Sequence, residues 1–203
     1  MGQTWLTSDT HLGHEKVARI RGFATVDAHD AAVLRSIARR VGDDDRLFLL
    51  GDVVMGPDHE AKDRNLARIR EAAGWARITV VLGNHDRPHP MHRNGHEHVA
   101  AWLRHFDAVV TSATVRHGGT TYLLSHFPYD GEGVTRENPY DRCTQWRLRD
   151  EGTPLIHGHV HDLLQWRLSE AGTVMLHAGL DAWDLAPVTI HDLTETAKET
   201  PRV

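Results

Sequence analysis

The sequence predicts a single α/β domain with mixed sheets over residues 1–203, with its core at about residues 3–192 and a polar tail at 193–203. In the first half, short apolar runs alternate with stretches of helical period, which is the order that produces parallel strands joined by helices. In the second half, apolar runs come in pairs across glycine-containing turns, as they do in antiparallel hairpins. No internal repeat and no linker divides the chain.

The expected strands are short apolar runs that fit buried positions in a sheet. In chain order they cover residues 4–7, 47–50, 78–82, 122–124, 154–156 and 188–191. Two hairpins are expected, one across Gly118-Gly119 (115–117 with 121–125) and one across residues 170–172 (163–168 with 173–176). Between the early strands, apolar residues repeat at helical spacing in three segments: Val33, Leu34, Ile37 and Val41; Leu66, Ile69 and Ala73; Val99, Trp102 and Leu103.

Composition narrows the class of protein. A formal net charge of −5 argues against a dedicated nucleic-acid surface. The single cysteine excludes an internal disulfide, and no apolar run approaches a membrane span or the core of a signal peptide. We therefore expect a cytoplasmic protein with no membrane partner. Residues 128–142 are rich in Pro, Gly, Asn and Asp and predict a long loop, a feature that is often functional.

Side chains of three polar types, Asp, Asn and His, follow the predicted strands where each strand ends. These side chains are Asp9 and His11, Asp52, Asn84, His126, and His159 with His161. Open α/β sheets place their ligand sites at the carboxyl ends of strands, so we expect these side chains to meet. Residues two apart on a strand point to the same side, which allows Asp9 with His11, and His159 with His161, to reach one ion.

The donor set predicts which metal binds. It mixes nitrogen and oxygen without thiolate, which suits Mn²⁺, Fe, Zn²⁺ or Ni²⁺ better than Ca²⁺ or Mg²⁺, and we place Mn²⁺ first. The donors outnumber those of one tetrahedral ion, so we expect two divalent ions per chain. Gly51, Gly83 and Gly158 precede ligands and allow close approach of the backbone.

In their order along the chain, these segments resemble the motifs of the calcineurin-like metallophosphoesterase superfamily. The matching segments are Asp9-x-His11, Gly51-Asp52, Gly83-Asn84-His85-Asp86, His126 and Gly158-His159-Val160-His161. The segments SDTHLGHEKV (8–17), RGF (21–23) and GLDAWDLAPV (179–188) are similar to its small phage and bacterial single-domain branch. The resemblance implies a four-layer sandwich in which two facing mixed β-sheets are flanked by helices.

The resemblance also assigns roles. It places Asp9, His11, Asp52 and His161 on one ion, with Asn84, His126, His159 and the shared Asp52 on the other. It makes His85 the proton donor. We add His14, Arg87, Arg136 and Arg142 as candidate substrate-binding residues, and we expect Asp86 to accept hydrogen bonds from the N–H groups of its own turn.

The expected function is hydrolysis of a phosphoester. Two divalent ions, two carboxylates and a hydroxide shared by the ions leave a charge of about +1, which matches a diester monoanion. Gly51-Asp52 is followed by Val53-Val54-Met55-Gly56, without the Asp and Arg of protein phosphatases. We therefore expect a small phosphodiester or nucleotide substrate, with 2′,3′-cyclic nucleotides ahead of 3′,5′-cyclic ones. The alternatives are a nuclease or phosphomonoesterase using the same site, and a non-catalytic scaffold.

Overall fold

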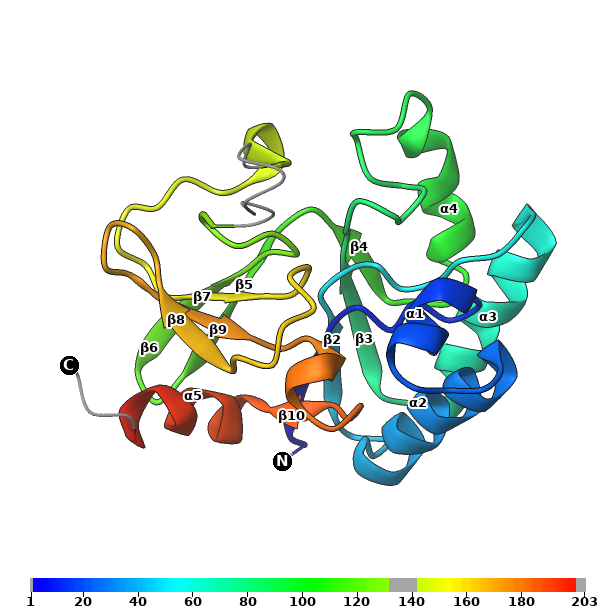
Figure 1. Ribbon diagram of the computed structural model, residues 1–203, viewed down its shortest axis with the longest axis horizontal. Coiled ribbons are helices and arrows are strands. Elements are labelled where there is room, and N and C mark those ends of the chain that lie inside the picture. The colour runs from blue at the N-terminus through cyan, green and yellow to red at the C-terminus, as the bar shows by residue number, and fades with distance from the viewer. Residues whose placement is uncertain (1, 132–141, 200–203) are drawn as a thin grey trace.

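Two five-stranded β-sheets face each other in the computed structural model, which describes residues 2–131 and 142–199 (Figure 1). The first sheet has the order β10-β1-β2-β3-β4, with β1 to β4 parallel and β10 antiparallel to β1. Its strands are β1 (Thr4–Thr7), β2 (Arg46–Leu49), β3 (Arg77–Val81), β4 (Ala108–Val110) and β10 (Val188–Thr189). The parallel order confirms the crossovers expected from the alternation of strands and helices.

The second sheet has the order β5-β6-β7-β9-β8. Its strands are β5 (Ala113–His117), β6 (Thr120–Leu124), β7 (Leu155–His157), β8 (Trp166–Leu168) and β9 (Val174–His177). Both predicted hairpins are present, as β5 with β6 and β8 with β9. Gly118 and Gly119 form the first turn with φ of 55° and 83°, a conformation that glycine adopts without steric cost. The parallel pairs β6–β7 and β7–β9 make the sheet mixed.

The first sheet buries both faces because its strands are apolar on both sides. On one face, Leu47 and Leu49 pack with the helices in a core cluster that includes Ile37 and Ile69. On the other face, side chains of the first sheet such as Phe48 pack with those of the second sheet in another cluster. The interior between the sheets is therefore continuous and apolar, and polar ligands can gather only where the strands end.

Helices cover the outer face of the first sheet (Figure 1). They are α1 (Glu15–Ile20), α2 (Val26–Arg40), α3 (His59–Ala72) and α4 (Val99–Trp102), the last preceded by the 3-10 turn η1 (Gly95–His98). The α2 and α3 helices begin where the Thr25 and Asp58 side chains accept the backbone N–H groups of Ala28 and Ala61. The helical segments predicted around Ile37 and Ile69 are thereby confirmed.

The end of the chain differs from the expected polar tail. The last strand stops at Thr189, and helix α5 (Ile190–Glu199) follows. Leu193 is fully buried and joins the cluster between the sheets, because α5 packs against β1, β9 and β10. A polar sequence with a few apolar residues on one helical face is enough for such a helix. Across the described ranges, none of the helices is long and apolar enough to span a bilayer.

Candidate metal centre

The polar side chains predicted at the strand ends come together where the two sheets meet. Asp9 and His11 follow β1, Asp52 follows β2, and Asn84 follows β3. His126 follows β6, and His159 with His161 follow β7. Within the described residues, their donor atoms form two groups of three, Asp9 with His11 and His161, and Asp52 with His126 and His159.

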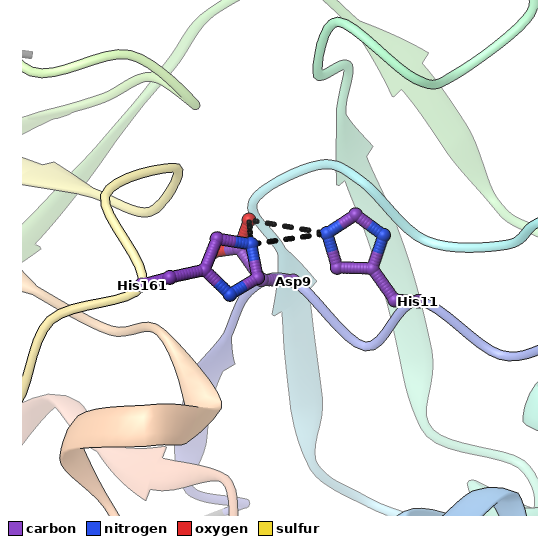
Figure 2. Close-up of side chains that lie close together, drawn as sticks. All are labelled: Asp9, His11 and His161. Carbon is purple, nitrogen blue, oxygen red and sulfur yellow. Dashed lines mark hydrogen bonds and ion pairs between the residues drawn. The ribbon is translucent and has the colours of Figure 1, made fainter. Parts of the chain in front are cut away.

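The first cluster consists of Asp9, His11 and His161 (Figure 2). The Nε2 atoms of His11 and His161 lie 3.1 Å apart. They point toward Asp9 Oδ1, at 3.9 Å from His11 and 3.5 Å from His161. Asp9 and His11 are buried, whereas the His161 side chain is 35% exposed and opens the cluster to solvent.

The second cluster consists of Asp52, His126 and His159, with Asn84 beside it. His126 Nε2 lies 3.0 Å from His159 Nδ1 and 3.1 Å from Asn84 Oδ1. The same nitrogen lies 3.5 Å from Asp52 Oδ1. Asn84 therefore contributes an oxygen to this cluster, as the resemblance implies.

Asp52 connects the two clusters through its separate oxygens. Its Oδ2 lies 3.6 Å from His11 Nε2, and its Oδ1 lies 3.5 Å from His126 Nε2. The Asp52 carboxylate therefore lies within 4 Å of a histidine nitrogen of each cluster.

The donor atoms fit bound metal ions. An ion bonded to two nitrogens at about 2.1 Å holds those nitrogens roughly 3.0–3.4 Å apart, and both His–His pairs lie at 3.0–3.1 Å. Asp9 Oδ1 is buried and has no hydrogen-bond partner among the described residues. A buried carboxylate oxygen without a donor is costly unless a cation compensates it. Divalent ions would therefore fit the spacing of the histidine nitrogens and would compensate the buried Asp9 oxygen.

Backbone strain concentrates on the same residues. Asp9, His11, Asp52, His159 and His161 all have positive φ, between 46° and 75°. Such angles are uncommon outside glycine and cost about 1–3 kcal/mol each, and they persist where the surrounding structure imposes them. The strands thus end in turns that direct several side chains toward one point.

Glycine at position 83 makes the second cluster compact. A Cβ there would lie 2.6 Å from the Asp52 backbone nitrogen and 2.9 Å from the His126 ring. These contacts are too close for any other residue, so the glycine expected from close approach is required.

The hydrogen bonds of Asp86 confirm the expected structural role, and they extend beyond its own turn. Its carboxylate accepts the backbone N–H groups of Gly83, Asp52 and Val53 at 2.7–3.0 Å. Burial and the neighbouring Asp52 carboxylate raise the pKa of Asp86. The side chain joins the turn after β3 to the turn after β2.

The electrostatics of the first cluster suit a cation. Burial by itself raises the pKa of Asp9, but His126, His161 and His11 outweigh it and hold the pKa well below its usual range. Burial lowers the pKa of His11 to about 3, against the opposing effect of Asp52 and Asp9. An ionised carboxylate beside a neutral imidazole is the combination that metal ions require.

The pKa of His126 shifts in the opposite direction to that of His11. Burial lowers its pKa, but the carboxylates of Asp52 and Asp9 raise it overall. An ion at the second cluster would therefore compete with a proton on His126.

His85 lies at the opening of the centre. Its side chain is 44% exposed, and its Nε2 lies 3.8 Å from Asp52 Oδ2. The His14 ring stands on the same side, with its centroid 5.3 Å from that of His11 and 6.3 Å from that of His85. Both rings are close enough to the clusters to contact a molecule bound there.

Arg87, one of the arginines chosen from the sequence, does not share this position. Arg87 is exposed, and its Nε donates to His98 Nε2 at 3.1 Å, so the structure turns it toward η1. Arg142 is exposed, and its backbone carbonyl accepts from Arg147. Arg136 lies outside the described residues.

Sequence reasoning about strand ends missed the residues behind the ligands. His126 Nδ1 donates to the Leu50 carbonyl at 2.7 Å, and His92 Nε2 lies 3.1 Å from the Asn84 carbonyl oxygen. Asp181 lies 2.9 Å from His161 Nδ1, and Arg21 contacts Asp181 and the Asp9 backbone. The segments 21–23 and 179–188 contain two of these residues and were the only available signal.

Fold and site together define a class: a two-sheet α/β sandwich with two clusters of candidate metal ligands at its strand ends. The family model of the calcineurin-like phosphoesterases matches residues 2–163. This chain belongs to that family, whose members are metal-dependent phosphoester hydrolases.

Phage proteins are among the relatives. The Gene 66 protein of Mycobacterium phage L5 is 40% identical over 191 residues, which cover 90% of this chain and 88% of the relative. The Gene 66 protein of Mycobacterium phage D29 is 39% identical over 199 residues, which cover 93% of each. A protein of unknown function from Aquifex aeolicus has the same fold, with a TM-score of 0.66 and 20% identity over 97% of this chain and 100% of that one. These relatives fit the small phage and bacterial branch.

Proposed function

We propose that this chain is a phosphodiesterase that hydrolyses small phosphodiesters, with 2′,3′-cyclic nucleotides ahead of 3′,5′-cyclic nucleotides. Two divalent ions, Mn²⁺ ahead of Fe, Zn²⁺ or Ni²⁺, would be held by the two clusters with Asp52 between them. The observation that carries the proposal is the donor set, in which Asp9 and Asp52 are the only carboxylates among the described ligand candidates.

The proposed chemistry divides between the ions and the side chains around them. When bound, the ions would activate water and neutralise charge on the phosphoryl oxygens. His85 would hold a proton and give it to the leaving oxygen, and its exposure and its distance of 3.8 Å from Asp52 support this role. His14 would donate a hydrogen bond to a phosphoryl oxygen, and the distance of 6.3 Å between its ring and that of His85 supports this role.

The charge of the centre supports a diester. Two carboxylates and one hydroxide against two divalent ions leave about +1, which matches a monoanion. A monoester dianion needs further cations. In the described ranges Arg87 donates to His98, and the Arg21 guanidinium is bonded to Asp181 and His29.

The test compares bis-p-nitrophenyl phosphate with p-nitrophenyl phosphate on Mn²⁺-loaded protein. Both substrates release the same phenolate, so the leaving group is constant and the phosphoryl charge varies. We expect a higher kcat/KM for the diester. A monoester preference that disappears in Arg136→Ala or Arg142→Ala would place a loop arginine in the site. A monoester preference that survives both changes would refute the charge argument.

A second panel addresses the size of the substrate. It contains 2′,3′- and 3′,5′-cyclic nucleotides beside single- and double-stranded oligonucleotides. We expect the cyclic nucleotides to be hydrolysed with the higher kcat/KM. Preference for the oligonucleotides would replace the small-substrate assignment with a nuclease.

A further inference from the structure

The face of His161 that points away from the first cluster is bonded to a carboxylate. His161 Nδ1 lies 2.9 Å from Asp181 Oδ2, on the 3-10 turn η3 (Leu180–Ala182). A carboxylate has no proton to donate, so Nδ1 carries the hydrogen and the neutral ring presents the Nε2 lone pair to the cluster. Carboxylates behind metal-binding histidines fix the tautomer and the ring orientation in this way.

Asp181 is itself held by Arg21. Arg21 Nε donates to Oδ1 at 2.8 Å and Nη2 to Oδ2 at 2.7 Å, which is a bidentate pair. The Arg21 side chain is 3% exposed and that of Asp181 is 13% exposed. Arg21 Nη2 also donates to the Asp9 backbone carbonyl at 2.9 Å. One guanidinium thus connects the residue behind His161 to the backbone of Asp9.

Helix α2 fixes the guanidinium from the other side. Arg21 Nη1 lies 3.0 Å from His29 Nε2, and His29 Nδ1 lies 2.9 Å from Asp30 Oδ1. Asp30 also accepts the Gly13 backbone N–H at 3.0 Å, in the loop that follows His11. His29 and Asp30 are buried. The network therefore reaches the first cluster from behind at His161, at Asp9 and beside His11, and it has no hydrogen bond to the second cluster among the described contacts.

We propose that Arg21 and Asp181 form a positioning pair that makes the ion site of Asp9, His11 and His161 tight, and that loss of the pair weakens this site selectively. The inference rests on the proposed function in one respect, that the two clusters bind ions. The pair acts through His161 and the Asp9 backbone and touches no substrate.

The test is Mn²⁺ binding to metal-free protein, followed by titration calorimetry and by elemental analysis after gel filtration. In Asp181→Ala we expect one ion to bind as in wild type and the other to bind about 10–100-fold more weakly. Asp181→Asn keeps an oxygen that can accept the His161 Nδ1 hydrogen, and it should recover part of the loss. Unchanged affinity for both ions, or equal weakening of both, would overturn the proposal.

Asp63→Ala is the matched control. Asp63 also lies between an arginine and a histidine, accepting Arg104 Nη2 at 3.0 Å and His105 Nε2 at 2.9 Å, but it belongs to neither cluster. This variant should bind both ions as wild type does. Wild-type protein that binds fewer than two ions would refute the two-ion centre itself, which separates that failure from failure of the pair.

Nitrogen NMR of the metal-free wild-type protein reports the tautomer of His161 directly, so this test does not depend on the folding of a variant. Long-range correlations of the histidine rings at pH 8.5 should show neutral His161 as the Nδ1–H tautomer. The Nε2–H tautomer as the main neutral form would overturn the proposal.

Discussion

The two halves of the metal centre are held in place by different means. The second cluster is buried, with His126 0% and His159 7% exposed, and contacts to main-chain groups support it: the Leu50 carbonyl accepts from His126 Nδ1, and the Asp86 carboxylate accepts the backbone N–H groups of Gly83, Asp52 and Val53. The first cluster opens to solvent at His161, and the side chains of Asp181 and Arg21 support it.

This difference indicates which of the two sites should retain its ion more firmly. The supports of the second cluster are buried and end on main-chain groups beside the strands, the Leu50 carbonyl and the N–H groups that the Asp86 carboxylate accepts. The support of the first cluster is a contact between side chains, beside a ligand, His161, that is 35% exposed. We therefore expect the second site to retain its ion more firmly and the first to exchange its ion more readily.

The largest effect is expected where the halves meet. Asp52→Asn removes the Asp52 carboxylate charge, which is half of the negative charge shared by both ions when the hydroxide is counted. It should therefore weaken the binding of both ions and lower kcat by roughly 10³-fold or more. Steady-state kinetics and elemental analysis check this. Asp107→Asn is the control, since that carboxylate accepts the backbone N–H of Ile78, as Asp52 accepts that of His85, but lies outside the centre. Turnover of Asp52→Asn near the wild-type value would refute the shared role.

The next effect concerns the Asp86 carboxylate, which supports the second half through main-chain N–H groups. Asp86→Ala leaves the N–H groups of Gly83, Asp52 and Val53 buried without an acceptor, at a cost of about 3–5 kcal/mol in the free energy of unfolding. Asp45→Ala also removes an acceptor of three donors, from Gln3, Gly42 and Trp5, but at a more exposed position where water can replace it. Urea unfolding of the metal-free variants should show the larger loss for Asp86→Ala. Equal losses would contradict the role of burial.

His85→Ala tests the chemistry at the opening. The variant should keep its metal and lose roughly 10²-fold in kcat on substrates with poor leaving groups, and less with nitrophenolate, which needs no proton. His14→Ala should instead raise KM by a similar factor on both substrate types. Equal losses of kcat for His85→Ala on both types would remove His85 from the role of proton donor.

The smallest effect is a pH dependence outside the clusters. Burial lowers the pKa of His89 from 6.5 to about 4. As the pH falls from 6.5 toward 4, the unfolded chain takes up a proton that the folded chain does not, so the folded state loses stability over this window. The loss is at most about 3 kcal/mol. His89→Gln should flatten the stability of metal-free protein across this range in urea unfolding, and identical slopes would contradict the assignment.

Much of the fold was predictable because its signals are local. The parallel strands β1, β2 and β3 and helices α2 and α3 follow from apolar runs and helical spacing, and Gly118-Gly119 specifies a hairpin turn. Helix α5 was missed because its sequence is polar and its few apolar residues, such as Leu193, become significant only when the sheets provide a surface to cover. Arg87 was assigned to substrate because it follows the ligands in sequence, yet its side chain turns to His98.

The sequence by itself determined which donor atoms the centre contains and that each follows a strand, because side-chain chemistry and strand periodicity are properties of short segments. The resemblance implies how the donors are grouped, but no pattern in the residues themselves does, and tertiary structure alone brings the donors of each group into contact. His11 and His161 are separated by 150 residues, and Arg21 and Asp181 by 160, yet each pair is in contact. Such contacts depend on how the two sheets and α2 pack together, and no local pattern specifies that packing.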